Sequence, residues 1–365
     1  MIVSSRKDDH IRLASEQQDN PLPRRDYDDI SFIHHALDGI NRDQVDLSAQ
    51  VGPWTYPAPL YVNGMTGGTD TAMIINRNLA IAASRTGITM ASGSVGIALD
   101  YPETAPSFTV IREENPDGIV FANIGAGRSV DDAKRAIDLL SADGLQLHVN
   151  AVQETVMPEG DREFSSWLGL IESIASSIDV PLMVKEVGAG LSAKTILKLR
   201  DAGVTIVDVA GKGGTDFGKI ENHRRDGGHD DYSYLNGFGG SAVQCLLDAR
   251  AAGLVGPGAD PGFAVLSSGG VRHPLDIMIS LALGARAVGV AGTFLKVALN
   301  EGADAMTSVL ETWSTRVGEM MALVGATSPA AMEYTDILIG GQSRDFADVR
   351  GIDRAALARR SQEDR

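Results

Sequence analysis

The feature that most limits how this chain can fold is a series of eight short apolar runs, separated by segments with helix signals. Most runs are continuous rather than alternating in polarity, which is typical of parallel strands covered on both faces. Serine or proline before the intervening segments and glycine after them indicate repeated strand–helix units. Eight such units predict an α/β chain, a closed (β/α)8 TIM barrel, with a doubly wound open sheet as the alternative. The runs occupy residues 60–65, 87–91, 118–124, 145–150, 181–187, 204–210, 264–268 and 287–291.

Three segments fall outside this repeat. Residues 1–59 contain five prolines and precede the first run, so we interpret them as an N-terminal extension. Residues 60–345 hold the predicted barrel, and we interpret residues 346–365 as a polar C-terminal tail. The connection after the sixth run, residues 211–262, is unusually long. A long loop in a compact domain is typically functional, and this one would lie on the active face of a barrel.

The charge balance and the cysteine count exclude several classes of function. With 32 Lys and Arg residues against 48 Asp and Glu residues, the formal charge is −16, so broad binding to nucleic acid or anionic lipid is not expected. No apolar stretch reaches about 20 residues and the N-terminus carries no apolar signal segment, which predicts a cytoplasmic protein without a membrane partner. The single cysteine, Cys245, excludes an intrachain disulfide and a structural zinc site built from cysteines.

Glycine clusters follow the seventh and eighth runs, and in a (β/α)8 barrel the functional groups lie at these carboxyl ends of the strands. Loops in these two places frequently bind phosphate through backbone amides and a helix N-terminus. Gly269 and Gly270 follow the seventh run, and Ala291 and Gly292 follow the eighth. Either cluster alone also satisfies ordinary turn requirements. Because both stand in the expected places, the sequence favours a cofactor that carries phosphate.

Lys185 ends the fifth run, where it is either a cation in a site or a surface residue with a buried stem. A fixed cation beside the N1–C2 carbonyl edge of a flavin stabilises the anionic reduced ring, so Lys185 favours FMN as the cofactor. Hydroxyl and amide side chains at other strand ends would complete the hydrogen bonds to the ring, although each alone also suits a loop or cap. These side chains are Thr66, Ser94, Asn123 and Thr215.

The fourth run ends in His148-Val149-Asn150, and Gln153 and Glu154 follow it. An extended chain directs the side chains of His148 and Asn150 to one face. One interpretation is a buried, hydrogen-bonded pair with a structural role. The other is a diphosphate site in which His148, Asn150 and Gln153 bind phosphate oxygens while Glu154 holds Mg²⁺. This metal takes few protein carboxylates and completes its shell with water and phosphate oxygens.

Together these motifs resemble those of the type 2 isopentenyl-diphosphate isomerases, which are flavin-dependent (β/α)8 enzymes of isoprenoid biosynthesis. The resemblance covers roughly residues 6–302, in order and in register with the predicted strands. It rests on Arg6-Lys7-Asp8-Asp9-His10-Ile11, Met65-Thr66-Gly67-Gly68, His148-Val149-Asn150 with Gln153-Glu154, residues 208–215, Ser268-Gly269-Gly270-Val271-Arg272 and residues 283–292.

The resemblance implies interconversion of isopentenyl and dimethylallyl diphosphate with reduced FMN and Mg²⁺. The flavin N5 atom would serve as acid and base, supported by Gln153, and NADPH would only prime the flavin. A prenyl diphosphate would be the small-molecule partner, and the assembly would be a homotetramer or homooctamer. By residue, the N-terminal extension would contribute Arg6 and Lys7 to the diphosphate site, joined by His148, Asn150 and Gln153, with Glu154 as the metal ligand. The flavin site would comprise Thr66, Gly67, Gly68, Ser94, Asn123, Lys185, Thr215, Gly269, Gly270, Arg272, Ala291 and Gly292.

Two departures from the family pattern bear on the substrate. After Ser94 the family has a Gln-Arg pair whose arginine contacts diphosphate, whereas this chain has Val95-Gly96, and Arg224 and Arg225 in the long loop are candidate substitutes. A Trp-Gly-Ile-Pro-Thr stretch of the family is replaced by residues 236–241. Two alternatives therefore stay open. One is an FMN-dependent 2-hydroxy-acid oxidase or dehydrogenase, which needs a His base and a carboxylate-binding Arg after the sixth strand. The other is a non-catalytic flavin-binding relative of the isomerase.

Overall fold

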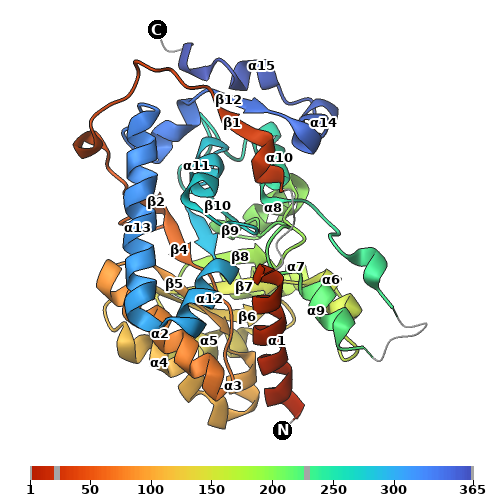
Figure 1. The fold of residues 1–365 in the computed structure, drawn as a ribbon. Helices are drawn as coiled ribbons and strands as arrows, with labels where there is room; N and C mark the ends of the chain where they lie inside the picture. Colours follow the sequence, from red (N-terminus) through yellow and green to blue (C-terminus); the bar gives the residue numbers. More distant parts are fainter. Residues whose placement is uncertain (1, 20–24, 226–230, 363–365) are drawn as a thin grey trace.

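The computed structural model describes residues 2–19, 25–225 and 231–362, and it confirms the predicted barrel. Eight parallel strands close in the order β10-β11-β4-β5-β6-β7-β8-β9, so each strand lies beside its neighbour in sequence and the last strand meets the first (Figure 1). The strands are β4 (Leu60–Val62), β5 (Met90–Ser94), β6 (Val120–Gly125), β7 (Gly144–Val149), β8 (Leu182–Glu186), β9 (Ile206–Asp208), β10 (Ala264–Ser268) and β11 (Val288–Val290).

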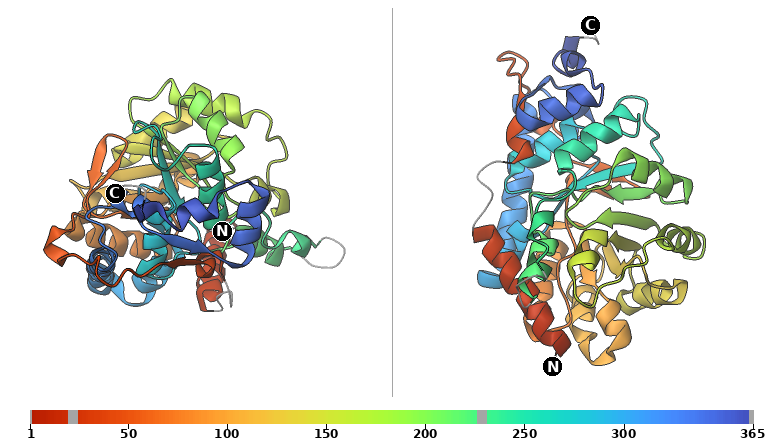
Figure 2. Two further views of the ribbon diagram at one scale, coloured as in Figure 1. Left: turned by 90° about the horizontal axis from the view of Figure 1, so that it is seen from above. Right: turned by 90° about the vertical axis from the view of Figure 1, so that its right-hand side faces the viewer.

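A helix of the outer layer follows each strand, as Figure 2 shows from two further sides. These helices are α2 (Asp70–Thr86), α4 (Pro106–Glu114), α5 (Val130–Leu140), α7 (Trp167–Ala175), α8 (Ala193–Asp201), α10 (Ala242–Ala251), α11 (Pro274–Ala282) and α13 (Gly302–Leu323). Shorter helices precede four of them at the carboxyl ends of the strands: α3 (Gly96–Asp100), α6 (Ala151–Val156), α9 (Phe217–His223) and α12 (Gly292–Asn300).

The helix signals in the sequence mark real boundaries. Ser129 and Ser192 cap α5 and α8 by accepting hydrogen bonds from the backbone N–H groups of Asp132 and Thr195, because the first turn of a helix leaves such donors unpaired. The second predicted strand begins too early. Gly87 ends α2 in the left-handed conformation, with φ of 69°, and β5 begins only at Met90.

The interior of the barrel is apolar at the amino ends of the strands, where a hairpin closes it. Strands β2 (Ala49–Val51) and β3 (Trp54–Tyr56) form this antiparallel hairpin. Its Val51 and Tyr56 belong to one buried cluster with Phe121 and Ile206 of the barrel. The ring of Trp54 meets that of Phe121 edge-on, with 5.2 Å between centroids. Because this end is filled, ligands have access from the carboxyl ends.

Parts of the N-terminal extension pack against the barrel and its C-terminal elements. Helix α1 (Ile2–Asp19) buries Ile11 and Leu13 and contacts α2, α9 and α12. Strand β1 (Ile30–Phe32) pairs antiparallel with β12 (Ile337–Ile339), so the two ends of the chain share a small sheet. In Figures 1 and 2 this sheet lies at the opposite end of the molecule from the N-terminus.

The C-terminal segment is helical and partly buried. It contains the end of α14 (Gly341–Val349) and all of α15 (Arg354–Leu357). Leu357 is buried, and the buried guanidinium of Arg360 donates hydrogen bonds to the carbonyl oxygens of Thr335 and Ala282. Residues 346–362 are therefore packed against the rest of the chain by specific contacts.

The connection after β9 is long, as predicted, and its described part contains helical segments. It contains α9, a 3-10 turn at Ser233–Leu235 and α10, which is the outer helix of that unit. Residues 226–230, within its charged stretch, lie outside the described residues. Among the helices of the described segments, none combines the length and apolar character that crossing a membrane requires.

Candidate functional site

Two adjoining cavities lie at the carboxyl ends of the barrel strands. The glycine-lined cavity is bounded by the loops after β9, β10 and β11. The polar cavity is bounded by the loops after β5, β6 and β7. Six residues line both cavities, which shows that the cavities adjoin. These residues are His10, Gly64, Met65, Lys185, Val187 and Phe217.

The glycine-lined cavity owes its shape to backbone packed directly on backbone. A Cβ atom on Gly269 would lie 1.9 Å from the carbonyl oxygen of Gly211, and one on Gly214 would lie 2.8 Å from the amide nitrogen of Gly270. Gly269 also has φ of +99°, which favours glycine. Helix α12 begins at Gly292 beside these loops. Glycine amides and a helix N-terminus are the groups that bind phosphate, so this cradle fits the phosphate of FMN.

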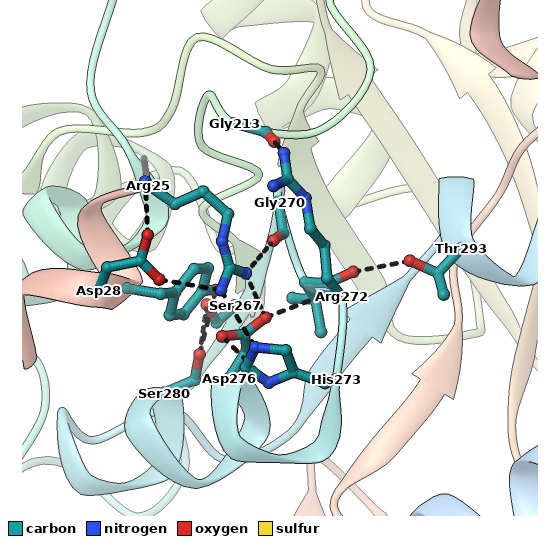
Figure 3. A network of polar contacts seen from close by, with 12 residues as sticks. Arg25, Asp28, Gly213, Ser267, Gly270, Arg272, His273, Asp276, Ser280 and Thr293 are labelled. Carbon is teal, nitrogen blue, oxygen red and sulfur yellow. Dashed lines mark hydrogen bonds and ion pairs between the residues drawn. The ribbon is translucent and has the colours of Figure 1, made fainter. Parts of the chain in front are cut away.

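A buried ion pair braces the loop after β10 from outside the cavity (Figure 3). Arg25 of the N-terminal extension contacts Asp276 of α11 at 2.5 Å and donates to the carbonyl oxygen of Gly270. Asp276 also accepts the backbone N–H of Arg272. On the other side of the loop, the hydroxyl of Thr293 donates to the carbonyl oxygen of Val271. The backbone of the loop after β10 is thus held by Arg25, which is far away in the sequence, and by Thr293 of the next strand–helix unit.

Lys185 lies at the junction of the two cavities, where the sequence places a cation. Its side chain is buried, and Nζ donates to the carbonyl oxygen of Glu186 at 2.6 Å. Burial lowers the pKa of Lys185, while Asp208 on the neighbouring strand β9 and Glu186 oppose that shift. The two carboxylates therefore favour the ammonium form within a largely buried site.

A chain of buried side-chain amides lies near the carboxyl ends of the barrel strands and links Asp208 to His148. Asn63 Nδ2 donates to Asp208 Oδ2 at 2.9 Å, and Gln146 Nε2 donates to Asn63 Oδ1 at 3.2 Å. Asn123 Nδ2 then donates to Gln146 Oε1 at 2.8 Å, and Asn123 Oδ1 lies 2.8 Å from Nδ1 of His148. We call these five residues the amide relay.

The direction of the amide relay is set at its first residue. The carboxylate of Asp208 only accepts hydrogen bonds, so Nδ2 of Asn63 must face it. The backbone N–H of Gly64 donates to Oδ1 of Asn63, which confirms the same orientation. With Asn63 oriented in this way, Gln146 donates to Asn63 and Asn123 donates to Gln146. The amide oxygen of Asn123 therefore faces His148, which donates through Nδ1–H and keeps Nε2 as an acceptor. Burial, with Lys185 and Lys7 nearby, lowers the pKa of His148 to about 3, so the imidazole is neutral at pH 7.

The predicted metal ligand, Glu154, lies in helix α6 on the wall of the polar cavity. Its Oε1 accepts Asn150 Nδ2 at 2.9 Å, and its Oε2 accepts the backbone N–H of Asp161 at 2.8 Å. Within the described residues no three His, Cys, Asp or Glu side chains form a metal cluster. A single carboxylate suits Mg²⁺, which keeps several water and phosphate ligands, and Asn150 would have to turn its amide nitrogen away from Oε1 for the metal to bind there.

The structure brings most of the predicted site residues together. The glycine-lined cavity is bounded by Thr66, Lys185, Thr215, Gly269, Gly270, Arg272, Ala291 and Gly292. The polar cavity is bounded by Lys7, Ser94, Asn123, His148, Asn150, Gln153, Glu154 and Lys185.

Three predicted residues are not among the linings. Gly67 and Gly68 face α4 and α3 instead: a Cβ atom on Gly67 would lie 2.0 Å from the ring of Phe108, and one on Gly68 would lie 2.9 Å from Ile97. Close packing therefore explains both glycines without contact to a cofactor. The side chain of Arg6 lies outside the described residues.

Helix α1 supplies site residues that the sequence reasoning did not assign. His10, Ile11, Ala14 and Gln18 face the glycine-lined cavity. Gln17 and Asp216 exchange two hydrogen bonds of 2.8 and 3.1 Å, which fix α1 against the loop after β9. Spacings of three and four residues among these positions are the signal for one helical face.

Comparison with known proteins identifies the family. A family model described as FMN-dependent dehydrogenase matches residues 145–338. The isopentenyl-diphosphate delta-isomerase of Streptomyces sp. (strain CL190) is 49% identical over 361 residues, which span 99% of this chain and 96% of the relative. The enzyme of the same name from Kitasatospora griseola is 48% identical with the same coverage.

Solved structures agree on the fold. A flavocytochrome b2 variant with benzoylformate superposes with a TM-score of 0.63 at 19% identity, covering 88% of this chain and 76% of its own. A mandelate oxidase variant with 2-hydroxy-phenylacetamide gives 0.61 at 17% identity, covering 91% of both chains. The chain belongs to the FMN-dependent dehydrogenase family of (β/α)8 barrels and, within it, to the isopentenyl-diphosphate delta-isomerases.

Proposed function

We propose that this chain interconverts isopentenyl diphosphate and dimethylallyl diphosphate with bound FMN and Mg²⁺. The observation that carries the proposal is the junction of the two cavities, which share Met65, Lys185 and Phe217. A flavin ring held by the glycine loops would meet, at this junction, a short apolar group anchored by its diphosphate in the polar cavity. The relatives at 48–49% identity carry the corresponding name.

The polar cavity would hold the diphosphate. Lys7, Asn150 and Gln153 line it, and their N–H groups would donate to anionic oxygens. The two amides would exchange their present acceptors, Glu154 and Glu221, for the diphosphate, and Arg6 is included on the resemblance alone. His148 keeps Nε2 as an acceptor, so it would contact a protonated phosphate oxygen or a bridging water. Glu154 would place Mg²⁺ against the same phosphate group.

The isomerisation adds a proton to the terminal methylene carbon and removes one from C2, without net oxidation. Reduced FMN would supply the acid and base for this transfer. The chain itself would hold the ring edge with Lys185, Thr66 and Thr215. Met65 and Phe217 would exclude water from the tertiary cationic character that develops on the alkene. Helix α1 would cover the site from outside through Ile11 and Ala14.

The alternative of a 2-hydroxy-acid oxidase or dehydrogenase lacks support in the segment directly after β9. Residues 211–216, four of which line the glycine-lined cavity, contain neither histidine nor arginine. His223, Arg224 and Arg225, further along the same connection, line neither cavity. Structures of such enzymes resemble this chain at 19% identity or less, which shows the fold alone. The non-catalytic alternative is disfavoured because Gln153 and Glu154 stand in the polar cavity beside a place for a flavin.

Two further parts of the proposal follow from the resemblance: NADPH would reduce the flavin before the first turnover, and the enzyme would assemble as a homotetramer or homooctamer. Action in the cytoplasm is a third part, which rests on the apolar pattern of the sequence.

An assay with parallel arms separates the three functions. FMN-loaded protein, reduced under anaerobic conditions, is incubated with isopentenyl diphosphate with and without Mg²⁺, and oxidised protein is incubated with lactate or mandelate. The proposal predicts the allylic isomer only in the Mg²⁺ arm and no flavin reduction by either acid. Flavin reduction by lactate or mandelate would favour the oxidase. No reaction in any arm would favour the non-catalytic relative.

A further inference from the structure

Arg128 fills the space beside the glycine that departs from the family pattern. It follows β6, in the loop before α5, and lines the polar cavity together with Gly96. A Cβ atom on Gly96 would lie 3.1 Å from Nη2 of Arg128 and 3.3 Å from its Cζ and Nε atoms. The guanidinium therefore stands where a side chain at position 96 would project.

This guanidinium is fixed in place by Asp100, the last residue of α3. Nη1 and Nη2 donate to the two carboxylate oxygens of Asp100 at 2.8 and 2.5 Å, a two-pronged geometry that only arginine provides. The side chain of Arg128 is 31% exposed, so it is packed along its length but open to the cavity. Besides these two bonds, Nη2 lies 3.5 Å from the carbonyl oxygen of Gly96 and Nη1 lies 3.9 Å from Oδ2 of Asp132. The N–H of Nε is left for a ligand.

The charge of the polar cavity depends on this residue. Apart from the histidines, its lining contains the cations Lys7, Lys185 and Arg128 and the carboxylates of Asp100 and Glu154. Without Arg128 the two signs balance, and an anionic group would gain little attraction. With Arg128 the lining carries an excess of positive charge.

We propose that Arg128 binds the diphosphate group of the substrate, in place of an arginine at position 96. The inference rests on the proposed function and names a further binding residue for it. Arg128 reaches the site from the loop after β6 rather than from the start of α3, and Gly96 leaves the room for it.

The two arginines that the sequence offered as substitutes are engaged elsewhere. Arg224 pairs with Glu221 and Glu159. Arg225 donates to the carbonyl oxygen of Val156 and stacks on the ring of Tyr232 at 4.9 Å. Neither arginine is among the residues that line the polar cavity.

Titration calorimetry of the FMN-loaded protein with inorganic diphosphate and Mg²⁺ tests the inference. Loss of a charge-assisted contact in Arg128→Ala is expected to raise the dissociation constant roughly tenfold to a hundredfold. The matched control is Arg316→Ala, which removes an arginine of α13 that pairs with Glu319 and lies outside the cavity lining. The control is expected to bind diphosphate as the unmodified chain does. Flavin content and melting temperature show that both variants are folded.

A second variant makes the test independent of any loss of stability. Gly96→Arg in the Arg128→Ala background places a guanidinium on the vacated spot and is expected to restore tight binding of diphosphate. If folded Arg128→Ala binds diphosphate as tightly as the unmodified chain, the inference is overturned. If Arg128→Ala weakens diphosphate binding but the unmodified protein yields no allylic isomer, the proposed function fails while the binding role of Arg128 stands.

Discussion

Nδ1 of His148 lies 2.8 Å from Oδ1 of Asn123, and this contact is the last step of a hydrogen-bond chain that begins at the carboxylate of Asp208. Asn123, Gln146 and Asp208 are all buried, so water cannot exchange for these partners. The chain has one direction, because its first acceptor cannot donate. The proton position of His148 on β7 is thus set by Asp208 on β9, two strands away in the barrel order.

The first prediction concerns the tautomer of His148. Nitrogen-15 shifts of labelled histidine, assigned by the loss of signals in His148→Gln, should show a protonated Nδ1 and an unprotonated Nε2 at pH 7. Gln146→Leu interrupts the amide relay two steps from His148 and should reduce the population of that tautomer. A protonated Nε2 in the unmodified protein would contradict the direction that Asp208 imposes on the amide relay.

The second prediction concerns pH and stability. The pKa of His148 is about 3 in the folded chain and about 6.5 in an unfolded one, so between these values the unfolded chain binds more protons. The contribution of His148 to the free energy of unfolding is complete above pH 6.5. It is lost as the pH falls towards 3, by about 1.4 kcal/mol for each pH unit. Urea unfolding at pH 7.5 and 5.5 should show a smaller loss of stability in His148→Gln. An equal loss of stability in the unmodified protein and in His148→Gln would refute the lowered pKa of His148.

The features that the sequence predicted depend on local patterns. Eight apolar runs identified the strands, and serine caps such as Ser129 identified helix starts, because both patterns are set within a few residues. The glycines at 269 and 270 were found for the same reason, since a sharp turn after a strand is a local requirement.

The features that escaped prediction depend on the stagger of the closed barrel. The amide relay joins side chains from β6, β7, β9 and the end of β4, and which of them face one another is fixed by strand register rather than by sequence spacing. The sequence did not predict a site role for Arg128, because an arginine in a loop is usually solvent-exposed. The packing of Arg128 against Gly96 is visible only in the structure. Gly67 and Gly68 have the sequence pattern of site residues, although their packing against Phe108 and Ile97 follows from helix placement.

The third prediction tests the phosphate cradle. Gly269→Ala would place a Cβ atom 1.9 Å from the carbonyl oxygen of Gly211, so the loops must separate. FMN affinity should fall at least tenfold, which corresponds to about 1.4 kcal/mol. Gly258→Ala is the matched control, because Gly258 also has positive φ but no neighbour within 4 Å. Fluorescence titration of the apoprotein with FMN measures both variants. Equal FMN affinity in the two would count against a close-packed cradle.

The fourth prediction concerns the metal. Glu154→Gln removes the negative charge while keeping an acceptor for the N–H of Asp161, so FMN should remain bound. Mg²⁺-dependent turnover should fall by roughly a hundredfold or more, since outer-shell partners of a metal alone cost about 10- to 100-fold. Glu159→Gln is the control, as its carboxylate pairs with Arg224 on the surface. Turnover that is equally Mg²⁺-dependent in Glu154→Gln would exclude Glu154 as the ligand.

The central claim is that this chain transposes the double bond of isopentenyl diphosphate by proton transfer without net oxidation. Proton NMR of the reduced, FMN-loaded protein with isopentenyl diphosphate and Mg²⁺ in deuterium oxide tests it most directly. The expected result is dimethylallyl diphosphate with deuterium in a methyl group, many turnovers per flavin and no reductant consumed after priming. Unchanged isopentenyl diphosphate in the presence of bound, reduced FMN would contradict the claim.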